Sequence, residues 1–160
     1  PDLVIDVYGH TFVIHNYADD PTNIQNQNLI QDIVKYLRAS LNWLRAGILK
    51  TRNGLTQEEK EGILIFGDKA DTRITEHGVR YAIDLTMNRD ASFYLDTRLL
   101  RKWLIENMQG KSVLNTFAYT GSLGVAARAG GATLTIQTDR NRQFLHDRLA
   151  KTQIMFKPKT

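Results

Sequence analysis

The residues whose types and spacing could do chemistry lie between Val113 and Asp139. The apolar run Val113–Leu114 leads through the turn Asn115–Gly121 into the small-residue run Ser122–Ala127. An apolar strand followed by a turn and a helix presents free backbone N–H groups at the C-terminal edge of a sheet, where nucleotide-like ligands bind. Asp139 follows Gly121 by 18 residues, close to the spacing of about 20 at which a carboxylate binds ribose hydroxyls. The pattern predicts a ligand that contains adenosine.

Spacing alone leaves two kinds of ligand open, a dinucleotide and the methyl donor S-adenosylmethionine. A dinucleotide fingerprint needs early glycines so that the backbone can approach a pyrophosphate, but Phe117 and Tyr119 stand at the early positions. Such bulky side chains would obstruct a pyrophosphate, and they could instead line a pocket for a ligand without phosphates. A nicotinamide-binding fold is the alternative that these residues argue against.

Each of these residues also has a purely structural interpretation. Phe117 and Tyr119 could be core aromatics, Gly121 could serve only the tight turn, and Asp139 could cap the next helix. The pair Arg98 and Arg101, upstream of the motif, could lie exposed and contribute little. Cysteine is absent, and the four histidines are too isolated for metal-ligand spacing: His10, His15, His77 and His146.

In the first half of the chain, the apolar patterns predict strands, a helix and more strands. Leu3–Tyr8 and Thr11–His15 are typical of a β-hairpin, and Thr56–Glu61 is polar like a loop. A short strand and a second hairpin around His77-Gly78 are predicted at Ile63–Phe66, Thr72–Glu76 and Val79–Leu85. Three- and four-residue apolar spacing predicts a helix, packed on the first hairpin, through Leu29, Ile30, Ile33, Val34, Leu37, Leu41 and Leu44.

In the second half, apolar spacing from Leu99 to Met108 predicts a helix, with Asp96 or Thr97 at its N-cap. The strand Ser112–Asn115, the helix Leu123–Ala129 and the strand Thr133–Gln137 then form one βαβ unit, whose strands we expect to be parallel. This unit would place the motif at the end of its first strand.

Composition sets the outer limits. The chain has 160 residues, 42% hydrophobic and 24% charged, which fits one globular domain or two small ones. No apolar run approaches the roughly 20 residues that span a bilayer, so we expect a cytoplasmic protein without a membrane partner. The net charge is +4, and residues 140–160 alone carry six basic side chains against Asp147. A basic segment of this kind can attract phosphates.

Four segments resemble, in the same order, class I S-adenosylmethionine-dependent methyltransferases that act on bacterial large-subunit ribosomal RNA. Asn115–Gly121 is similar to the family's first cofactor motif. Ser92–Arg98 with Arg101 is similar to its Phe-Leu-Asp-Gln-Arg segment and second arginine, although Thr97 replaces the glutamine. Ile74–Asp84 resembles the family's middle-domain hairpin, and Leu3–Gly9 resembles the opening strand of that domain.

The resemblance implies an α/β fold, with an N-terminal α+β subdomain at residues 1–90 and the first half of a Rossmann-like methyltransferase sheet at residues 91–160. It also implies S-adenosylmethionine as the cofactor and assigns no catalytic residue. Tyr119, Thr120 and Gly121 would bracket the methionine end, and Asp139 would hold the ribose. The full set of implied cofactor-binding residues is Asn115, Phe117, Tyr119, Thr120, Gly121, Asp139 and Arg98.

The implied function is methyl transfer to ribosomal RNA in the cytoplasm, with RNA as the partner, no metal, and a homodimer left open. The family's Asp-Pro-Pro type motif is not found before Thr160, so we expect a truncated piece that is inactive alone. Methylation at C5 of a pyrimidine would need a cysteine nucleophile, which the chain lacks. The alternative is a non-catalytic RNA-binding or interaction fragment, in which the α+β unit and the basic segment do the binding.

Overall fold

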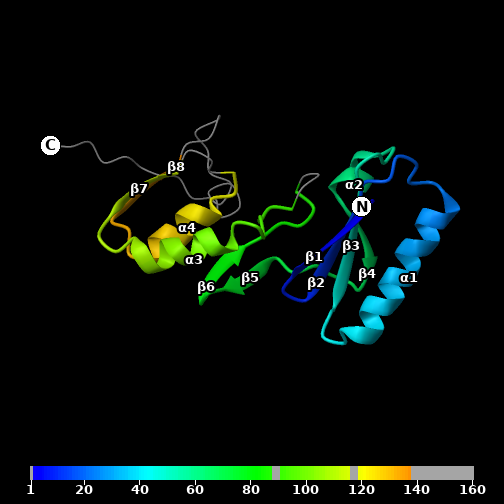
Figure 1. Cartoon of the computed structure of the whole chain (residues 1–160), viewed down its shortest axis with the longest axis horizontal. Coiled ribbons are helices and arrows are strands. Elements are labelled where there is room, and N and C mark those ends of the chain that lie inside the picture. Colours follow the sequence, from blue (N-terminus) through cyan, green and yellow to red (C-terminus); the bar gives the residue numbers. More distant parts are fainter. Residues whose placement is uncertain (1, 88–90, 116–118, 138–160) are drawn as a thin grey trace. The chain divides into compact units, whose positions relative to one another are not determined.

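The computed structural model describes residues 2–87, 91–115 and 119–137, which form two compact units (Figure 1). The first unit contains Pro1–Thr75 and Ala82–Phe93, and the second contains Glu76–Tyr81 and the chain from Tyr94 onward. Within the described part of the chain, no helix is long and apolar enough to cross a membrane.

The first unit is built on a four-stranded mixed sheet with the order β1-β2-β3-β4. Its strands are β1 (Leu3–Tyr8), β2 (Thr11–Asn16), β3 (Ala46–Thr51) and β4 (Ile63–Phe66). β1 and β2 form the antiparallel hairpin that the sequence predicted, and β4 also lies where it was predicted. β3 was not predicted, although it pairs in parallel with β2 and antiparallel with β4.

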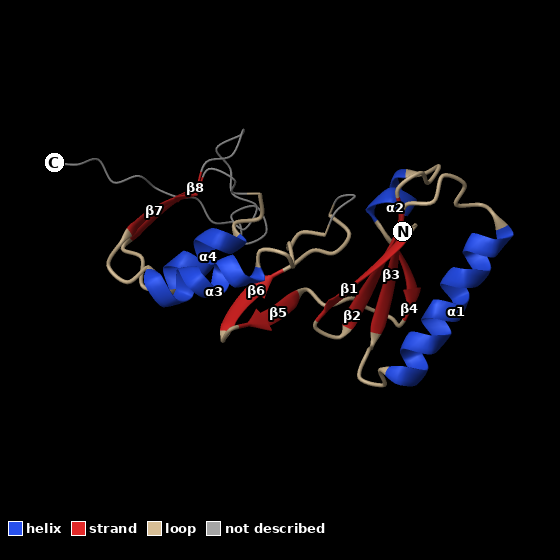
Figure 2. Cartoon of the chain, in the orientation of Figure 1, coloured by secondary structure: helices blue, strands red, loops and turns tan. Residues whose placement is uncertain are grey.

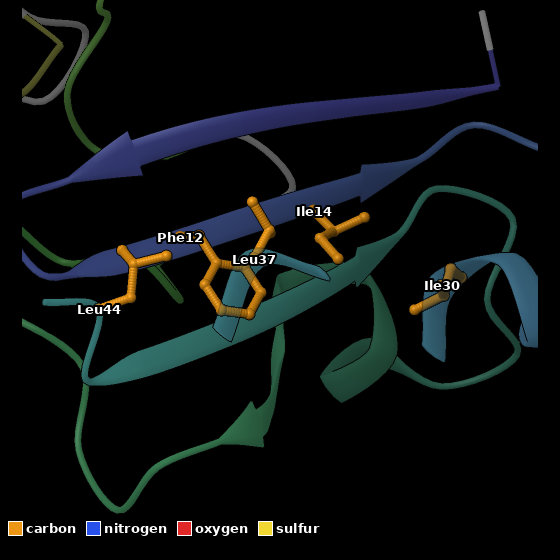
Figure 3. Close-up of a cluster of buried hydrophobic side chains, with 5 residues drawn as sticks. All are labelled: Phe12, Ile14, Ile30, Leu37 and Leu44. Atoms are coloured by element: carbon orange, nitrogen blue, oxygen red, sulfur yellow. The ribbon is translucent and has the colours of Figure 1, made fainter. Parts of the chain in front are cut away.

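The helix α1 (Ile24–Ser40) connects the parallel strands β2 and β3, since a parallel pair requires a crossover. The side chain of Asn23 begins the helix by accepting a hydrogen bond from the backbone N–H of Gln25 at 2.8 Å. The predicted packing of this helix on the hairpin is confirmed, because α1 and β2 share one buried cluster. Its members are Phe12, Ile14, Ile30, Leu37 and Leu44 (Figure 3).

The predicted helix was too long at its C-terminal end. Leu41 is the C-cap and Leu44 lies beyond the helix, yet Leu44 still packs into the same core. The core is tight at Gly47 of β3, where a Cβ atom would overlap the ring of the fully buried Phe12. Apolar spacing therefore identified most of the core residues, but it wrongly included Leu29, which is exposed, and it misplaced the end of the helix.

The prediction of a loop at Thr56–Glu61 is wrong, because residues Gln57–Glu61 form the short helix α2. A capping box explains it: the hydroxyl of Thr56 accepts from the backbone N–H of Glu59 at 3.1 Å. In return, the carboxylate of Glu59 accepts from the backbone N–H of Thr56 at 2.9 Å. These reciprocal bonds satisfy N–H groups that the first turn of a helix leaves open.

Acidification should weaken this helix. The hydrogen bond from the Thr56 backbone N–H to the Glu59 carboxylate holds the pKa of Glu59 below its ordinary value. A lowered pKa means that ionised Glu59 stabilises α2 above the ordinary pKa, and that this contribution is lost as the pH falls through the lowered value. We expect the protection factors of the Gln57–Glu61 amides, which are the exchange rates measured by NMR and corrected for the intrinsic pH dependence of exchange, to fall across that pH range. Glu59→Gln, which cannot titrate, should show no such pH-dependent step.

A two-stranded sheet of β5 (Arg73–Glu76) and β6 (Val79–Ala82) follows, and the division between the units runs through it. Its turn is His77-Gly78, where both residues are left-handed, with φ of 50° and 78°. The predicted hairpin is confirmed, with shorter strands, and the turn requires positive φ at His77 as well as at the glycine.

The second unit contains the predicted βαβ arrangement (Figure 2). The elements are α3 (Arg98–Asn107), β7 (Ser112–Asn115), α4 (Ser122–Ala129) and β8 (Leu134–Gln137), and β7 and β8 are parallel. A Cβ atom on Gly130, at the end of α4, would collide with backbone of α3, so the two helices approach closely there. The core of this unit consists of Leu104, Met108, Ala126, Ala127 and Ala132.

Candidate cofactor site

Six residues separate the end of β7 from the start of α4, and the structure describes three of them, Tyr119, Thr120 and Gly121. Asn115, the last residue of β7, is buried. Two of the residues that follow have left-handed backbones, Tyr119 with φ of 36° and Gly121 with φ of 81°. Gly121 is also the N-cap of α4, and as a glycine it has no side chain that could cap the helix. α4 thus follows the C-terminal end of β7 in the chain. A strand that leads into a helix in this order binds nucleotide-like ligands in α/β folds.

The structure places three of the predicted site residues, Tyr119, Thr120 and Gly121, directly before α4, and a fourth, Asn115, at the end of β7. Phe117 and Asp139 lie outside the described residues. The parallel register pairs Asn115 with Gln137 of β8, so the two strands end side by side at this edge.

Tyr119 is not a core aromatic, because 38% of it is exposed. Its ring lies against the ring of Tyr94, with 5.2 Å between the centroids and 43° between the planes. Tyr94 is 43% exposed. Aromatic pairs at such distances attract each other beyond the area that they bury, so the turn after β7 has a partner in the segment before α3.

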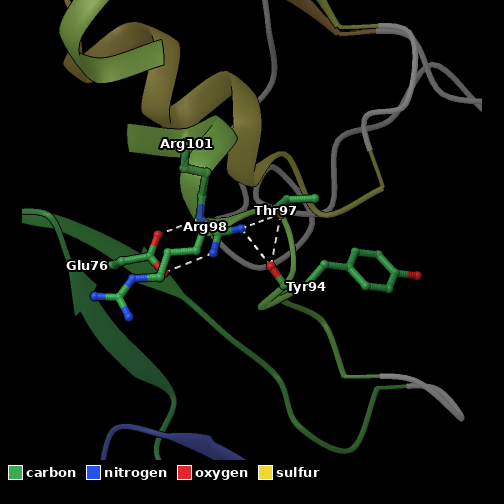
Figure 4. A network of polar contacts seen from close by, with 5 residues as sticks. All are labelled: Glu76, Tyr94, Thr97, Arg98 and Arg101. Carbon is green, nitrogen blue, oxygen red and sulfur yellow. Dashed lines mark hydrogen bonds and ion pairs between the residues drawn. The ribbon is translucent and has the colours of Figure 1, made fainter. Parts of the chain in front are cut away.

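Arg101 of α3 is fully buried and pairs with Glu76 of β5 (Figure 4). Its Nε and Nη2 donate to the two carboxylate oxygens of Glu76 at 2.7 and 2.9 Å. Its Nη1 donates to the carbonyl oxygen of Tyr94 at 2.7 Å and to the hydroxyl of Thr97. The suggestion that Arg101 could be an exposed surface residue is therefore wrong, because this guanidinium uses the buried carboxylate and the chain before α3 as partners.

Arg98 lies on the first turn of α3, with its side chain 65% exposed and its Nε 3.9 Å from Glu76. The exposed half of the suggested arginine pair is thus Arg98. Thr97 is the N-cap of α3, one of the two predicted residues, but its side chain does not cap the helix. Instead its hydroxyl donates to the carbonyl oxygen of Tyr94 at 2.9 Å.

Tyr81 of β6 completes the surroundings of Arg101, whose Cζ lies 5.9 Å from the centroid of the Tyr81 ring. Burial raises the pKa of Tyr81, while the charge of Arg101 lowers it and that of Glu76 raises it. Sequence reasoning gave no role to Glu76 or to Tyr94. The second arginine, Arg101, which follows the Ser92–Arg98 segment, was the signal that pointed here, but its partner lies 25 residues away in sequence.

The turn fits a nucleoside ligand that carries an amino-acid group. Backbone N–H groups at the start of α4 suit a carboxylate, the amide of Asn115 can both donate and accept, and Tyr119 offers an exposed ring. Among residues 2–87, 91–115 and 119–137, no group of three or more His, Cys, Asp or Glu residues could hold a metal ion.

A cavity of about 830 Å³ lies in the first unit, lined by residues of α1, β3 and β4 among others. Its apolar lining includes Ile30, Val34, Leu49 and Ile65. It contains none of the predicted site residues, and no strand there leads through a left-handed turn into a helix. We therefore place the cofactor site at the turn after β7 on chemical grounds, not by the size of the cavity.

Comparison with known proteins identifies the family of the chain. Residues 59–153, more than half of the chain, match the family described as S-adenosylmethionine-dependent methyltransferase. The ribosomal RNA large subunit methyltransferase K/L of Vibrio campbellii is 33% identical over 153 residues, which cover 91% of this chain and 21% of that protein. Its counterpart in Vibrio cholerae is 34% identical over 152 residues, with 90% and 21% covered. The chain thus spans about a fifth of the length of these relatives.

Solved structures give the same result. A protein from Streptococcus mutans described as a SAM-dependent methyltransferase superposes with a TM-score of 0.73 at 27% identity, covering 93% of this chain and 38% of that one. A protein described as a methyltransferase, solved in complex with S-adenosylhomocysteine, superposes with a TM-score of 0.74 at 28% identity, covering 93% and 37%. The α/β fold with part of a Rossmann-like sheet is therefore confirmed, and the chain belongs to the S-adenosylmethionine-dependent methyltransferase family.

Proposed function

We propose that this chain supplies the methionine and ribose side of the cofactor pocket in an enzyme that methylates ribosomal RNA in the cytoplasm. The observation that carries the proposal is the turn between β7 and α4, where Tyr119 and Gly121 both have left-handed backbones beside the buried Asn115. Such a turn opens the start of α4 to a ligand. In this proposal residues 1–90 form the α+β subdomain and residues 91–160 form part of the cofactor domain.

Each site residue has a role in the proposal. Tyr119, Thr120 and Gly121 bracket the methionine end of the cofactor, next to Asn115 and Phe117. Asp139 accepts hydrogen bonds from the ribose hydroxyls, and Arg98 lies near the methionine carboxylate. The cofactor supplies a methyl group on a positively charged sulfur. The residues of this chain bind and orient it. None of them is assigned to position the target base.

The choice of RNA as substrate rests on the relatives, which are named as methyltransferases of large-subunit ribosomal RNA. The charge of the chain supports it, because residues 140–160 carry six basic side chains against one acidic side chain. Lysine and arginine side chains attract the phosphates of RNA by a salt-dependent interaction.

Calorimetric titration with S-adenosylhomocysteine tests the proposal directly. We expect saturable binding with one site per chain. RNA binding without any binding of S-adenosylhomocysteine would favour the alternative of a non-catalytic RNA-binding protein and would contradict the proposed function.

Asp139→Ala should weaken binding of S-adenosylhomocysteine about 10- to 100-fold, the scale of a lost charge-assisted hydrogen bond. Asp139→Asn should cost less, because an amide oxygen still accepts one hydrogen bond. Titration calorimetry on both variants, with circular dichroism to confirm folding, measures the effect. A folded Asp139→Ala variant that binds as the parent does would show that the ribose is held elsewhere.

A further inference from the structure

The contact between Tyr94 and Tyr119 joins the proposed cofactor turn to the segment before α3. Tyr119 has a φ of 36°, a conformation that costs a non-glycine residue about 1–3 kcal/mol and persists only where the surroundings hold it. The ring of Tyr94, 5.2 Å away, is the aromatic partner of Tyr119. The side chain of Tyr94 therefore lies where it can limit the movement of Tyr119.

The backbone of Tyr94 is in turn fixed by two hydrogen bonds. Its carbonyl oxygen accepts hydrogen bonds from Nη1 of Arg101 at 2.7 Å and from the hydroxyl of Thr97 at 2.9 Å. Figure 4 shows this carbonyl group turned toward Arg101, while the Tyr94 ring points away from the network. One residue thus faces two ways, with its backbone in a buried network and its ring at a half-exposed surface.

The network itself is rigid. The guanidinium of Arg101 is fully buried and makes two parallel hydrogen bonds to Glu76. Bidentate pairs of this kind fix geometry as well as adding energy, because the planar fork matches the carboxylate. A side chain held at four hydrogen bonds leaves the Tyr94 carbonyl little freedom.

We propose that Tyr94 is a positioning residue for the cofactor turn: the Glu76–Arg101 pair fixes its backbone, and its ring braces Tyr119 in the left-handed conformation that ligand binding requires. The inference rests on the proposed function and adds to it a residue that acts on the cofactor through Tyr119. It also gives Glu76, in the β5–β6 hairpin, an indirect influence on cofactor affinity.

The test compares three variants of the full-length protein by titration with S-adenosylhomocysteine. Tyr94→Ala removes the ring and should raise the Kd about 3- to 10-fold, the scale of an aromatic pair. Tyr94→Phe keeps the ring and should therefore have the same Kd as the parent. Leu99→Ala is the matched control, since it truncates a large side chain of α3 that is 77% exposed, and it should leave the Kd unchanged.

A merely structural role would change stability instead of affinity. Because the Tyr94 ring is half-exposed, we expect the Tm of Tyr94→Ala to stay within about 3 °C of the parent. The ring protons of Tyr119 should also shift in ligand-free NMR spectra of Tyr94→Ala, and not in those of Leu99→Ala, because a neighbouring aromatic ring is lost.

The outcomes separate the two proposals. If the parent protein binds S-adenosylhomocysteine and Tyr94→Ala binds it equally well, the positioning role is wrong and the proposed function stands. If Tyr94→Phe is as weak as Tyr94→Ala, the hydroxyl and not the ring is responsible, which also overturns the role. A parent protein that binds no S-adenosylhomocysteine overturns the proposed function and this inference with it.

Discussion

Arg101→Met is expected to lower the free energy of unfolding of the second unit by about 3–5 kcal/mol, the cost of breaking a buried ion pair from one side. The substitution leaves the carboxylate of Glu76 largely buried without its guanidinium. It also removes the donor to the carbonyl oxygen of Tyr94 and to the hydroxyl of Thr97. A buried acceptor left without its donor adds to the loss.

Native-state hydrogen exchange of the α3 amides measures this effect within the second unit, which matters because the chain has two units and need not unfold in a single step. Lys102→Met is the matched control on the same helix. Lys102 is half-exposed and lies 3.8 Å from Glu106, so its loss should cost less than about 1 kcal/mol. Equal protection in Arg101→Met and Lys102→Met would mean that the buried pair does not stabilise the unit.

The double variant Glu76→Met with Arg101→Met refines the interpretation. Apolar side chains of similar size often replace a buried ion pair without loss of stability. We therefore expect the double variant to recover much of the free energy of unfolding that Arg101→Met loses. Low cofactor affinity in such a stable double variant would separate the positioning role of the pair from its contribution to stability.

The elements that the sequence predicted are those with clear periodicity or turn chemistry. The β1–β2 hairpin was predicted from its β-branched and aromatic residues on either side of Gly9-His10, and α1 from apolar spacing of three and four residues. The βαβ unit was predicted from its order of apolar strand, turn and small-residue helix. β3 was missed because its six residues, Ala46–Thr51, do not alternate and include few of the β-branched and aromatic side chains that marked β2, a strand that is also buried throughout. A central strand that is covered on both faces has no polar side to show in the sequence.

Two further errors have local causes. α2 was interpreted as a loop because its residues are polar, although Thr56 and Glu59 have the spacing of a capping box. An exposed position was suggested for Arg101 because arginine is almost never fully buried without a partner, and the partner, Glu76, is distant in sequence. The capping box of α2 could therefore have been recognised from the sequence, but a pair between distant segments could not.

The candidate site divides in the same way. The order of strand, turn and helix around Asn115 and Gly121 follows from the sequence, because glycine is the residue that adopts positive φ freely. The left-handed backbone of Tyr119 does not follow from it, since tyrosine rarely adopts this conformation. Its partner Tyr94 comes from a different segment of the chain. The contact between the two rings is therefore visible only in the folded structure.

Gly121→Val should weaken binding of S-adenosylhomocysteine by up to about 100-fold, because the bound turn must then absorb up to about 3 kcal/mol of backbone strain. Gly121 has a φ of 81° and is buried at the start of α4. A β-branched residue is a genuine outlier at positive φ, so the turn should relax into a shape that no longer presents the first N–H groups of α4 to a ligand. Titration calorimetry with S-adenosylhomocysteine measures the loss.

Gly110→Val supplies the control that separates strain at the site from strain in general. Gly110 has a φ of 71° in the same unit, and a Cβ atom there meets nothing within 4 Å. Both variants should lose about 1–3 kcal/mol of stability from the same backbone cause, but only Gly121→Val should lose affinity. If Gly110→Val weakens binding as much, the loss reflects a less stable unit and not the geometry of the turn. The assignment of Gly121 to the cofactor site would then be wrong.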